Sequence, residues 1–379
     1  MFKKILSAVT LVLIAVIAYK AFSAPAPGDM TGMTMFEATL ASFKDMNGWV
    51  LLLLIPEQLF MYYAAGKIYF AFLQQRKGFK ISQGKLTRIS LEINFMNHAI
   101  PSGGMSGLAY LVWRLKDYNV TAGQISFIHI LRYGICALAN AAQTVIAIGI
   151  IICTGQLVAG GTWALLLAAG IAFGVIGLIV VAWLIVRKQK NVDWLSTTAT
   201  NFINKVMREI TRGKKRKYLK EEDVTRFFGD LRADYLQLKS NRRILWKPFL
   251  WGFIYSFLEL ATYWVVGCAM GHPEILPQIM IAEGVGSVVG TVLVTPGGVG
   301  GYEAAFIAVL AATGVPLHVA TITVIVTRVC VLLGTIVCGF VPYQMALLSR
   351  PDKFDAKKVE QEIAKENAEA AAKAVDKKK

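Results

Sequence analysis

The sequence is poor in charged residues for a chain of 379 residues. Only 17% of the residues are charged and 55% are hydrophobic, whereas soluble globular domains have about 25% charged and 45–50% apolar residues. The mean hydropathy is +0.53, because charge is missing from long stretches of the chain. This composition excludes an ordinary soluble domain and is typical of a membrane protein.

Sequence signatures of catalysis and metal binding are also missing. The cysteines lie in or at the ends of apolar segments, without CxxC or another metal-type spacing, which predicts small buried hydrophobes. No Walker-type motif is present, and the apolar segments contain no paired acidic motif of the kind that a membrane transferase would need. We therefore expect no enzyme activity, no metal and no bound cofactor. The cysteines are Cys136, Cys153, Cys268, Cys330 and Cys338.

Long apolar runs are what the sequence does have. Several reach the roughly 20 residues that cross a hydrocarbon core of about 30 Å. They are residues 48–73, 125–153, 161–186, 248–270 and 318–348. A shorter run after Lys3 and Lys4 has the layout of a signal peptide and also fits a short first membrane helix in which Lys20 reaches the interface. We expect the retained helix.

Positive charge is concentrated in one segment. The formal net charge is +16, and residues 187–247 contain 17 Lys and Arg against 7 Asp and Glu. A basic segment between two membrane spans is typical of a cytoplasmic loop, which anionic lipids can hold at the surface. We therefore expect membrane lipids, and not nucleic acid, as partners.

Charge and parity together predict that one apolar element does not cross the membrane. Residues 76–85 and 187–247 are both predicted to be cytosolic, and three apolar elements lie between them, so an even number of crossings is required. The first element, residues 86–115, is interrupted at 100–104 by Ile-Pro-Ser-Gly-Gly. Proline removes a backbone donor and glycine permits a reversal of the chain. We predict a re-entrant hairpin whose tip lies inside the membrane.

The same reasoning predicts a second hairpin that enters from the opposite face. The run at 248–270 leaves the cytosol and the run at 318–348 returns to it, so residues 278–313 must begin and end outside. They are interrupted at 295–303 by Thr-Pro-Gly-Gly-Val-Gly-Gly-Tyr-Glu. Two hairpins of opposite orientation, each followed by an apolar helix with an arginine, predict an inverted repeat.

The expected fold class is therefore an all-α polytopic membrane protein with about six spanning helices and two oppositely inserted re-entrant helical hairpins. We expect three parts. Residues 1–47 form an N-terminal membrane helix and an external linker, and residues 48–348 form the transmembrane domain with its cytosolic basic loop at 187–247. Residues 349–379 form a charged cytosolic tail.

Broken helices of this kind indicate transport. Irregular backbone at membrane depth persists only where protein or a water-filled cavity satisfies its polar groups, and discontinuous helices from inverted repeats recur in secondary transporters. Half-helices that start near Gly107 and Tyr302 would direct their N-termini into the membrane interior. Helix N-termini favour anions, so a phosphate is the expected ligand.

Two arginines are the strongest candidates for holding that phosphate. Arg132 and Arg328 lie in apolar runs, where charge is costly and usually functional or paired. A guanidinium can bind phosphate through two parallel hydrogen bonds. The alternative is that each arginine only pairs with a carboxylate, such as Glu92, Glu283 or Glu303, and holds helices together.

Further candidates lie at the two hairpin tips. Glu303, just after the second tip, can bind a cationic headgroup, exchange a proton or cap its half-helix. His98, beside the first tip, can titrate near neutral pH or serve as a satisfied polar group. The tip residues complete the predicted substrate site. They are Pro101, Gly103, Gly104, Pro296, Gly297 and Gly298.

The two tips carry a family resemblance. Residues 295–305, followed by Gly-Val-Pro at 314–316 and by Arg328, resemble a motif of the lysylphosphatidylglycerol synthase transmembrane-region family of flippase-like proteins. Residues 97–104, Asn-His-Ala-Ile-Pro-Ser-Gly-Gly, resemble the first motif of that family. The resemblance extends over about residues 48–348.

The resemblance implies a lipid flippase-like fold with a headgroup cavity between two re-entrant hairpins. Arg132, Arg328 and Glu303 match the family pattern by position. Residues 106–108 are Ser-Gly-Leu, where the family pattern would have an acidic residue after a glycine. The headgroup therefore stays open between aminoacylated phosphatidylglycerol and another lipid.

We expect a flippase-like transporter that moves the headgroup of an anionic or aminoacylated phospholipid, or of an isoprenoid-phosphate lipid. The expected location is a bacterial inner membrane, with a cytoplasmic C-terminus. Two alternatives stay open: a secondary transporter of a small anionic solute and a membrane-embedded lipid transferase. The resemblance implies that bifunctional members also carry a soluble aminoacyl-transferase domain, which we do not expect in residues 349–379, so a separate synthase is one partner to consider, as is a second copy of the chain.

Overall fold

The fold is built of helices throughout the part of the chain that is described. The structure is a computed structural model, and it describes residues 46–74, 81–99, 105–118, 120, 122–156, 161–188, 243–292 and 301–349, together with single positions between 37 and 44 and between 190 and 204. Every regular element in these residues is helical. The predicted N-terminal helix, most of the basic loop and the charged tail lie outside the described residues.

Five helical stretches are long and apolar enough to cross a membrane, as the sequence predicts. Four are α4 (Leu54–Leu73) with the short α3 (Gly48–Leu51) before it, α7 (Ala122–Thr154), α8 (Thr162–Arg187) and α11 (Arg243–Ala269). The fifth runs from α14 (Leu317–Thr335) through the π-helical turn η5 (Ile336–Phe340) into α15 (Val341–Leu348). The protein is therefore an all-α polytopic membrane protein.

Two pairs of shorter helices lie among these spans. The first pair is α5 (Gln83–Ala99) with α6 (Met105–Leu115), and the second is α12 (Leu276–Val292) with α13 (Gly301–Ala312). The two members of each pair pack against each other. At 1.5 Å per residue, α6 and α13 are only about 16–18 Å long, which is too short to cross a hydrocarbon core of about 30 Å.

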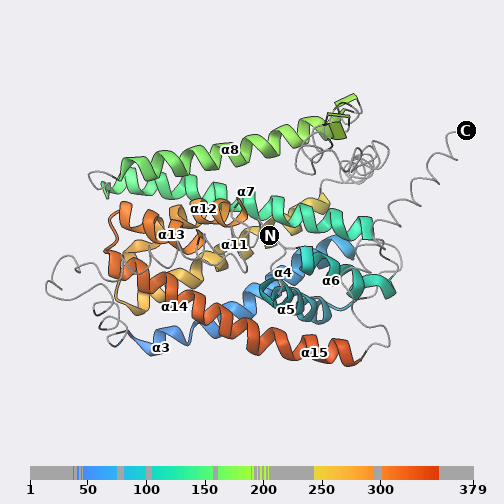
Figure 1. The fold of residues 1–379 in the computed structure, drawn as a ribbon, viewed down its shortest axis with the longest axis horizontal. Helices are drawn as coiled ribbons and strands as arrows, with labels where there is room; N and C mark the ends of the chain where they lie inside the picture. The colour runs from blue at the N-terminus through green and yellow to red at the C-terminus, as the bar shows by residue number, and fades with distance from the viewer. Residues whose placement is uncertain are drawn as a thin grey trace, which may run out of the picture.

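The two pairs begin at opposite ends of the bundle (Figure 1). The start of α12 lies beside the C-terminal end of α7, where Gln278 Nε2 donates to Gln156 Oε1 at 3.3 Å. The start of α5 lies beside α15 at the other end, where a terminal nitrogen of Arg88 donates to the carbonyl of Pro342 at 3.1 Å. This arrangement agrees with the predicted inverted repeat. The entry of both tips into a membrane stays a prediction, because residues 100–104 and 293–300 lie outside the described residues.

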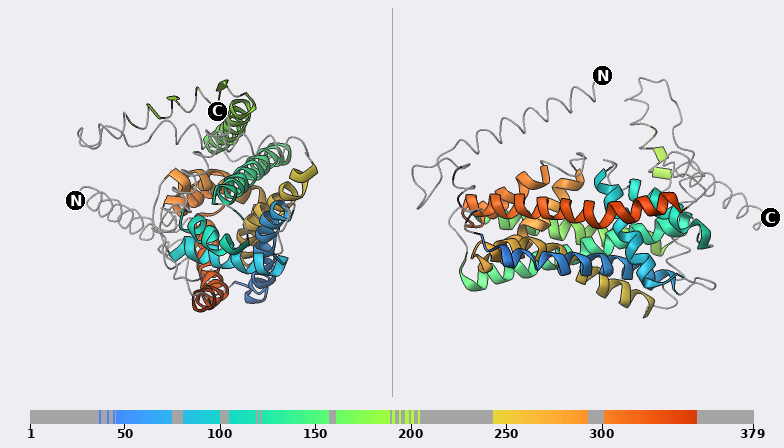
Figure 2. Two further views of the ribbon diagram at one scale, coloured as in Figure 1. Left: turned by 90° about the vertical axis from the view of Figure 1, so that its right-hand side faces the viewer. Right: turned by 90° about the horizontal axis from the view of Figure 1, so that it is seen from below.

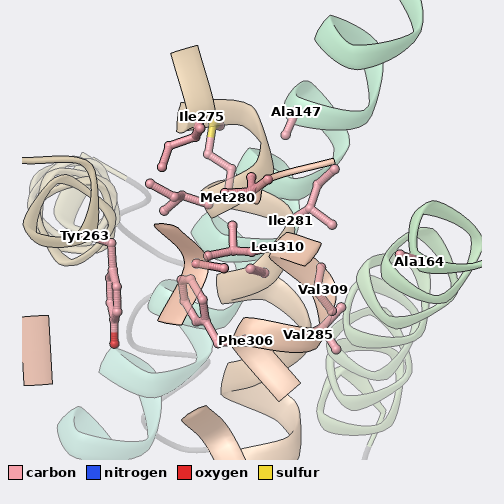
Figure 3. Packing of buried hydrophobic residues seen from close by; sticks show 14 of the residues in the cluster. Ala147, Ala164, Tyr263, Ile275, Met280, Ile281, Val285, Phe306, Val309 and Leu310 are labelled. Carbon is pink, nitrogen blue, oxygen red and sulfur yellow. The ribbon is translucent and has the colours of Figure 1, made fainter. Parts of the chain in front are cut away.

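Apolar packing fixes the second pair against its neighbours (Figure 3). The buried cluster joins α7, α8, α11, α12, α13 and α14, and inside a bilayer such contacts stabilise the bundle by close van der Waals packing, since lipid tails are as apolar as these side chains. Its members include Ala147, Ala164, Tyr263, Ile275, Met280, Ile281, Val285, Phe306, Val309 and Leu310. A comparable cluster holds α5 and α6 against α4 and α7.

Helix α8 lies at the edge of the bundle, outside α7 (Figure 2). Its main packing partners are α7 and α12, and only 22% of its most apolar window is buried inside the protein. Large apolar side chains such as Leu166, Phe173 and Leu178 are exposed on it. A helix that is apolar on all sides and largely uncovered by protein is typical of one that faces lipid.

Candidate functional site

A cavity of about 490 Å³ lies between the two helix pairs and the spanning helices. Side chains from α4, α5, α7, α8, α11, α12, α13 and α14 line it. Cavities of about 300–1,000 Å³ are typical of small-ligand sites. The cavity thus lies between the two helix pairs, and its use for a headgroup stays a prediction.

Four ionisable side chains of unit charge face this cavity: Arg132, Glu259, Glu283 and Arg328. They come from α7, α11, α12 and α14 in turn. Both predicted arginines are therefore brought to one site, although 196 positions separate them in the sequence. Charge at membrane depth costs about 2.5–3.5 kcal/mol per residue on insertion scales, so four such groups around one cavity indicate a functional site.

Arg132 is held by aromatic side chains. One of its terminal nitrogens donates to the Tyr69 hydroxyl at 3.1 Å, and its guanidinium lies 5.5 Å from the Tyr69 ring and 5.0 Å from the Tyr255 ring. The Tyr69 hydroxyl also bonds His129 Nδ1 at 3.0 Å. The Nε of Arg132 is buried without a hydrogen-bond partner. Among the described residues no carboxylate lies within ion-pair distance of this arginine. This guanidinium therefore has donors left for a ligand.

Arg328 has a different environment. Its Nε lies 2.7 Å from Glu303 Oε1, which is an ion-pair distance, although the N–H does not point at that oxygen well enough for a hydrogen bond. The guanidinium also lies 4.1 Å from the centre of the Tyr302 ring. The Tyr302 hydroxyl donates in turn to Glu283. The predicted structural role, pairing with a nearby carboxylate, is thus present for Arg328 but not for Arg132.

The two carboxylates at the cavity differ in their partners. Glu283 is 4% exposed and accepts the hydrogen bond from Tyr302. Glu259 is close enough to interact electrostatically with Glu283 and with both arginines. Glu259 therefore lines the same cavity as Glu283 and both arginines.

Helix α5 contributes amides. Asn94 Nδ2 donates to the Tyr62 hydroxyl at 2.7 Å and to Thr335 Oγ1 at 2.8 Å, and Asn97 Oδ1 accepts from the backbone N–H of Gly107 at 3.0 Å. A Cβ at position 107 would lie 2.4 Å from that oxygen, so any other residue would require the Asn97 side chain to shift. The N–H at Gly107 is thereby used within the protein, and the predicted role of this N-terminus in anion binding loses one donor.

Glu92 belongs to a separate structural network. It is fully buried and accepts from Arg114 Nε at 2.7 Å, from Arg88 Nε at 3.0 Å and from the Tyr110 hydroxyl at 3.0 Å. The suggested pairing of Glu92 with Arg132 is wrong, because these other donors already surround the carboxylate. The network holds α5 to α6.

Comparison with models of protein families identifies the membrane region. The model described as "Lysylphosphatidylglycerol synthase TM region" matches residues 5–339. The chain belongs to this family. Comparisons with curated proteins and with solved structures gave no match.

Several predicted site residues of this family member fall outside the described residues. The tip residues Pro101, Gly103, Gly104, Pro296, Gly297 and Gly298 do so, and the side chain of His98 does too, although its backbone belongs to α5. Their predicted role in the site stays a prediction. Glu303 is described; it is not among the residues that line the cavity, but it forms an ion pair with Arg328, which does line it.

Sequence reasoning missed the aromatic part of the site. The tyrosines that line the cavity are Tyr62, Tyr69, Tyr133, Tyr255, Tyr263 and Tyr302. Tyrosine carries no charge and occurs freely in apolar helices, so the hydropathy pattern does not single it out. The available signal was Tyr133, which adjoins Arg132 in the sequence, since tyrosine rings stabilise a guanidinium through cation–π contacts; the other rings come from helices that only the fold brings together.

Proposed function

We propose that the protein is a flippase-like transporter whose central cavity receives the phosphate of a membrane-lipid headgroup. Membership of the lysylphosphatidylglycerol synthase transmembrane-region family supports a lipid-related role. The observation that carries the proposal is Arg132, a guanidinium that faces the cavity with a buried Nε and has no carboxylate of the described residues within ion-pair distance. Such a group is suited to a two-point contact with phosphate.

The second arginine completes the proposed phosphate site. Arg328 faces the same cavity from α14. The Tyr302 ring stabilises its guanidinium through a cation–π contact, which does not use the N–H donors. An anion between the two arginines would satisfy donors that are costly to leave unpaired at membrane depth. We place the protein in a bacterial-type inner membrane with a cytoplasmic C-terminus.

Free phosphate or another small anion offers the same chemistry as a lipid phosphate. Lipid is preferred because one wall of the cavity is α8, which contributes Ile171, Ala172 and Val175 and whose far side exposes apolar residues such as Leu166. A lipid can keep its acyl chains beside such a helix while its headgroup enters the cavity. A small anion needs a water-filled entrance instead.

Reconstituted liposomes test the proposal. Purified protein is placed in phosphatidylcholine liposomes with a trace of acyl-labelled fluorescent phosphatidylglycerol, and a membrane-impermeant reductant destroys the probe in the outer leaflet. Wild type should expose inner-leaflet probe faster than empty liposomes. Arg132→Ala and Arg328→Ala should each reduce that rate by about tenfold or more, because truncation at a buried charge site costs about 2–5 kcal/mol.

Arg88→Ala is the matched control. Arg88 is an arginine outside the cavity lining, its side chain is 38% exposed, and Glu92 keeps Arg114 as a partner when it is lost. This variant should scramble the probe at close to the wild-type rate. A second arm measures uptake of labelled inorganic phosphate into the same liposomes. Phosphate uptake without probe movement would replace the lipid proposal with small-anion transport, and neither activity would refute both.

A further inference from the structure

The charge balance around the cavity disfavours binding of an anion unless a positive charge enters with it. Arg132 and Arg328 face Glu259 and Glu283, and Glu303 forms an ion pair with Arg328 as well. Three carboxylates therefore surround two guanidiniums before any ligand is present. A phosphate monoanion would add one more negative charge to a site that lies in a low-dielectric interior, where uncompensated charge is strongly unfavourable.

Glu259 is a carboxylate that lines the cavity together with both arginines. Its helix α11 packs against α4, α7, α12, α14, α3 and the 3₁₀ turn η3 (Pro273–Ile275). The ionisable groups that interact with Glu259 from these elements are the two arginines, Glu283 on α12 and Glu57 on α4.

Ionisable side chains of other kinds also surround the carboxylate. Tyr62 on α4, Cys136 on α7 and Tyr255 one turn earlier on α11 line the same cavity as Glu259. The residues of α3 are Gly-Trp-Val-Leu, without an ionisable side chain, and His272 and Glu274 at η3 pair with each other at 2.9 Å. A negative ligand near the arginines would lie in the same cavity as Glu259. Its charge would disfavour the ionised form of that carboxylate.

A line of polar groups leads from Glu259 toward one end of the bundle. Thr262 follows Glu259 by three residues on α11, so both lie on the same helix face, and both line the cavity. The Thr262 hydroxyl donates to Glu57 Oε1 at 3.2 Å. Glu57 lies in the first turn of α4, and its Oε2 is buried without a hydrogen-bond partner. Glu57 is therefore a second carboxylate near this wall of the cavity, with one buried oxygen that can accept a proton.

We infer that the transporter carries a proton together with each net negative charge on its cargo, with Glu259 as the proton-binding group. The inference rests on the proposed function, because it concerns a lipid phosphate bound between the two arginines. The proton would be a second, coupled substrate. A pH gradient would then supply the energy for transport without a nucleotide.

The proposed cycle is balanced in charge and atoms. A proton from the water on one side forms an O–H bond with the Glu259 carboxylate as the phosphate monoanion docks at Arg132 and Arg328. After the cavity opens to the other side, that O–H bond breaks and the proton leaves with the headgroup. One positive and one negative charge cross together, so the step is electroneutral and follows a pH gradient but not a membrane potential.

Leaflet distribution under a pH gradient tests the inference. Proteoliposomes with an acidic interior should move fluorescent phosphatidylglycerol outward, so that its outer-leaflet fraction rises above the value at equal pH, and the reverse gradient should lower it. A potassium–proton exchanger should abolish the shift, whereas a potassium diffusion potential should not change it. Fluorescent phosphatidylcholine, which has no net charge, should not respond to the gradient.

Glu259→Gln mimics the protonated carboxylate permanently. We expect it to equilibrate the anionic probe between leaflets without any response to the gradient. Glu274→Gln makes the same change at an exposed carboxylate outside the cavity and should respond like wild type. A gradient response that persists in Glu259→Gln would overturn the assignment of the proton to this residue.

Proton flux in the wild-type protein gives a second measurement that does not depend on any variant. Anionic phospholipid added to the outer leaflet should move inward and acidify the lumen, as read by an entrapped pH dye. Probe movement without acidification and without a gradient response would refute the coupling and leave the proposed function intact. Absence of any probe movement would refute the proposed function itself.

Discussion

Arg132 and Arg328 differ in how their charge is compensated, although both face one cavity. Arg328 is paired with Glu303 at 2.7 Å, while Arg132 relies on a hydroxyl and on the faces of tyrosine rings. Cation–π contacts leave the N–H groups in the plane of the guanidinium available. The difference suggests that Arg132 makes the first contact with an anion and that Arg328 exchanges Glu303 for the anion afterwards.

Glu303→Gln separates these two roles. The substitution keeps the shape of the side chain and removes its charge, so Arg328 loses its ion-pair partner. Loss of this partly buried pair should lower the free energy of unfolding by about 1–2 kcal/mol, between the values for exposed and buried pairs. Movement of the anionic probe should be retained or faster, because Arg328 is then free for phosphate. The thermal unfolding midpoint in detergent and the liposome assay check the two effects.

Loss of movement in Glu303→Gln would contradict this account. The carboxylate would then be part of the transport cycle itself, as the sequence also allows. Glu274→Gln, with its carboxylate at an exposed turn, is the control for an effect of carboxylate removal as such.

The sequence predicts which charged residues matter better than it predicts their partners. Charge in an apolar run is visible in the sequence because it is rare, and Arg132 and Arg328 are found in this way. The contact of Arg132 with Tyr69 joins α7 to α4, which depends on helix packing and leaves no local pattern. Arg114, which binds Glu92, was missed because it lies in the last turn of α6, where a basic residue is ordinary.

At the scale of the elements, close helix contacts depend on single glycines. Gly66 on α4 is buried against α5, and a Cβ at this position would lie 2.9 Å from both Cα and N of Thr87. These are backbone atoms, so a methyl group can be accommodated only if one helix moves. The first helix pair is thereby held against α4 and contributes Asn94 and Asn97 to the cavity.

Gly66→Ala should therefore destabilise the protein. Overpacking of this kind typically costs about 1–3 kcal/mol, which should lower the unfolding midpoint in detergent and slow probe movement through displacement of α5. Gly174→Ala is the control, since a Cβ there meets nothing within 4 Å on the exposed face of α8. An equal midpoint for the two variants would show that α4 and α5 are less tightly packed than the structure describes.

The elements themselves are well predicted from the sequence for a physical reason. A bilayer demands about 20 apolar residues per crossing, so the five spans follow from composition alone and agree with the structure. The division of 86–115 and 278–313 into helix pairs follows from proline and glycine at their centres. The π-helical turn between α14 and α15 was not predicted, because it depends on packing around residues 336–340 and not on a breaker residue.

At the scale of the whole molecule, parity of the crossings gives a definite topology. The turn between α11 and α12 and the end of α8 should lie on opposite sides of the membrane, and Figure 1 places them at opposite ends of the bundle. Both places offer an exposed ionisable side chain, Glu274 and Lys188. The positive-inside rule assigns the Lys188 end to the cytoplasm.

Cysteine labelling tests this topology. In a background without native cysteines, Glu274→Cys should react with a membrane-impermeant maleimide in intact spheroplasts. Lys188→Cys should react only after the membrane is permeabilised. Labelling of both positions from the same side would contradict an odd number of crossings between them, and with it the opposite insertion of the two helix pairs.

The position of α8 has a consequence for how a two-part molecule can travel. One side of this helix borders the charged cavity, and its other side exposes leucine and phenylalanine. A single helix thus separates the charged cavity from the surface that is typical of lipid contact. An amphipathic molecule can lie across the edge of α8. Its polar headgroup would then pass the arginines while its acyl chains stay in the hydrocarbon of the bilayer. For the proposed lipid cargo, the protein would enclose only the headgroup, so a cavity of about 490 Å³ would be enough for a molecule with long acyl chains.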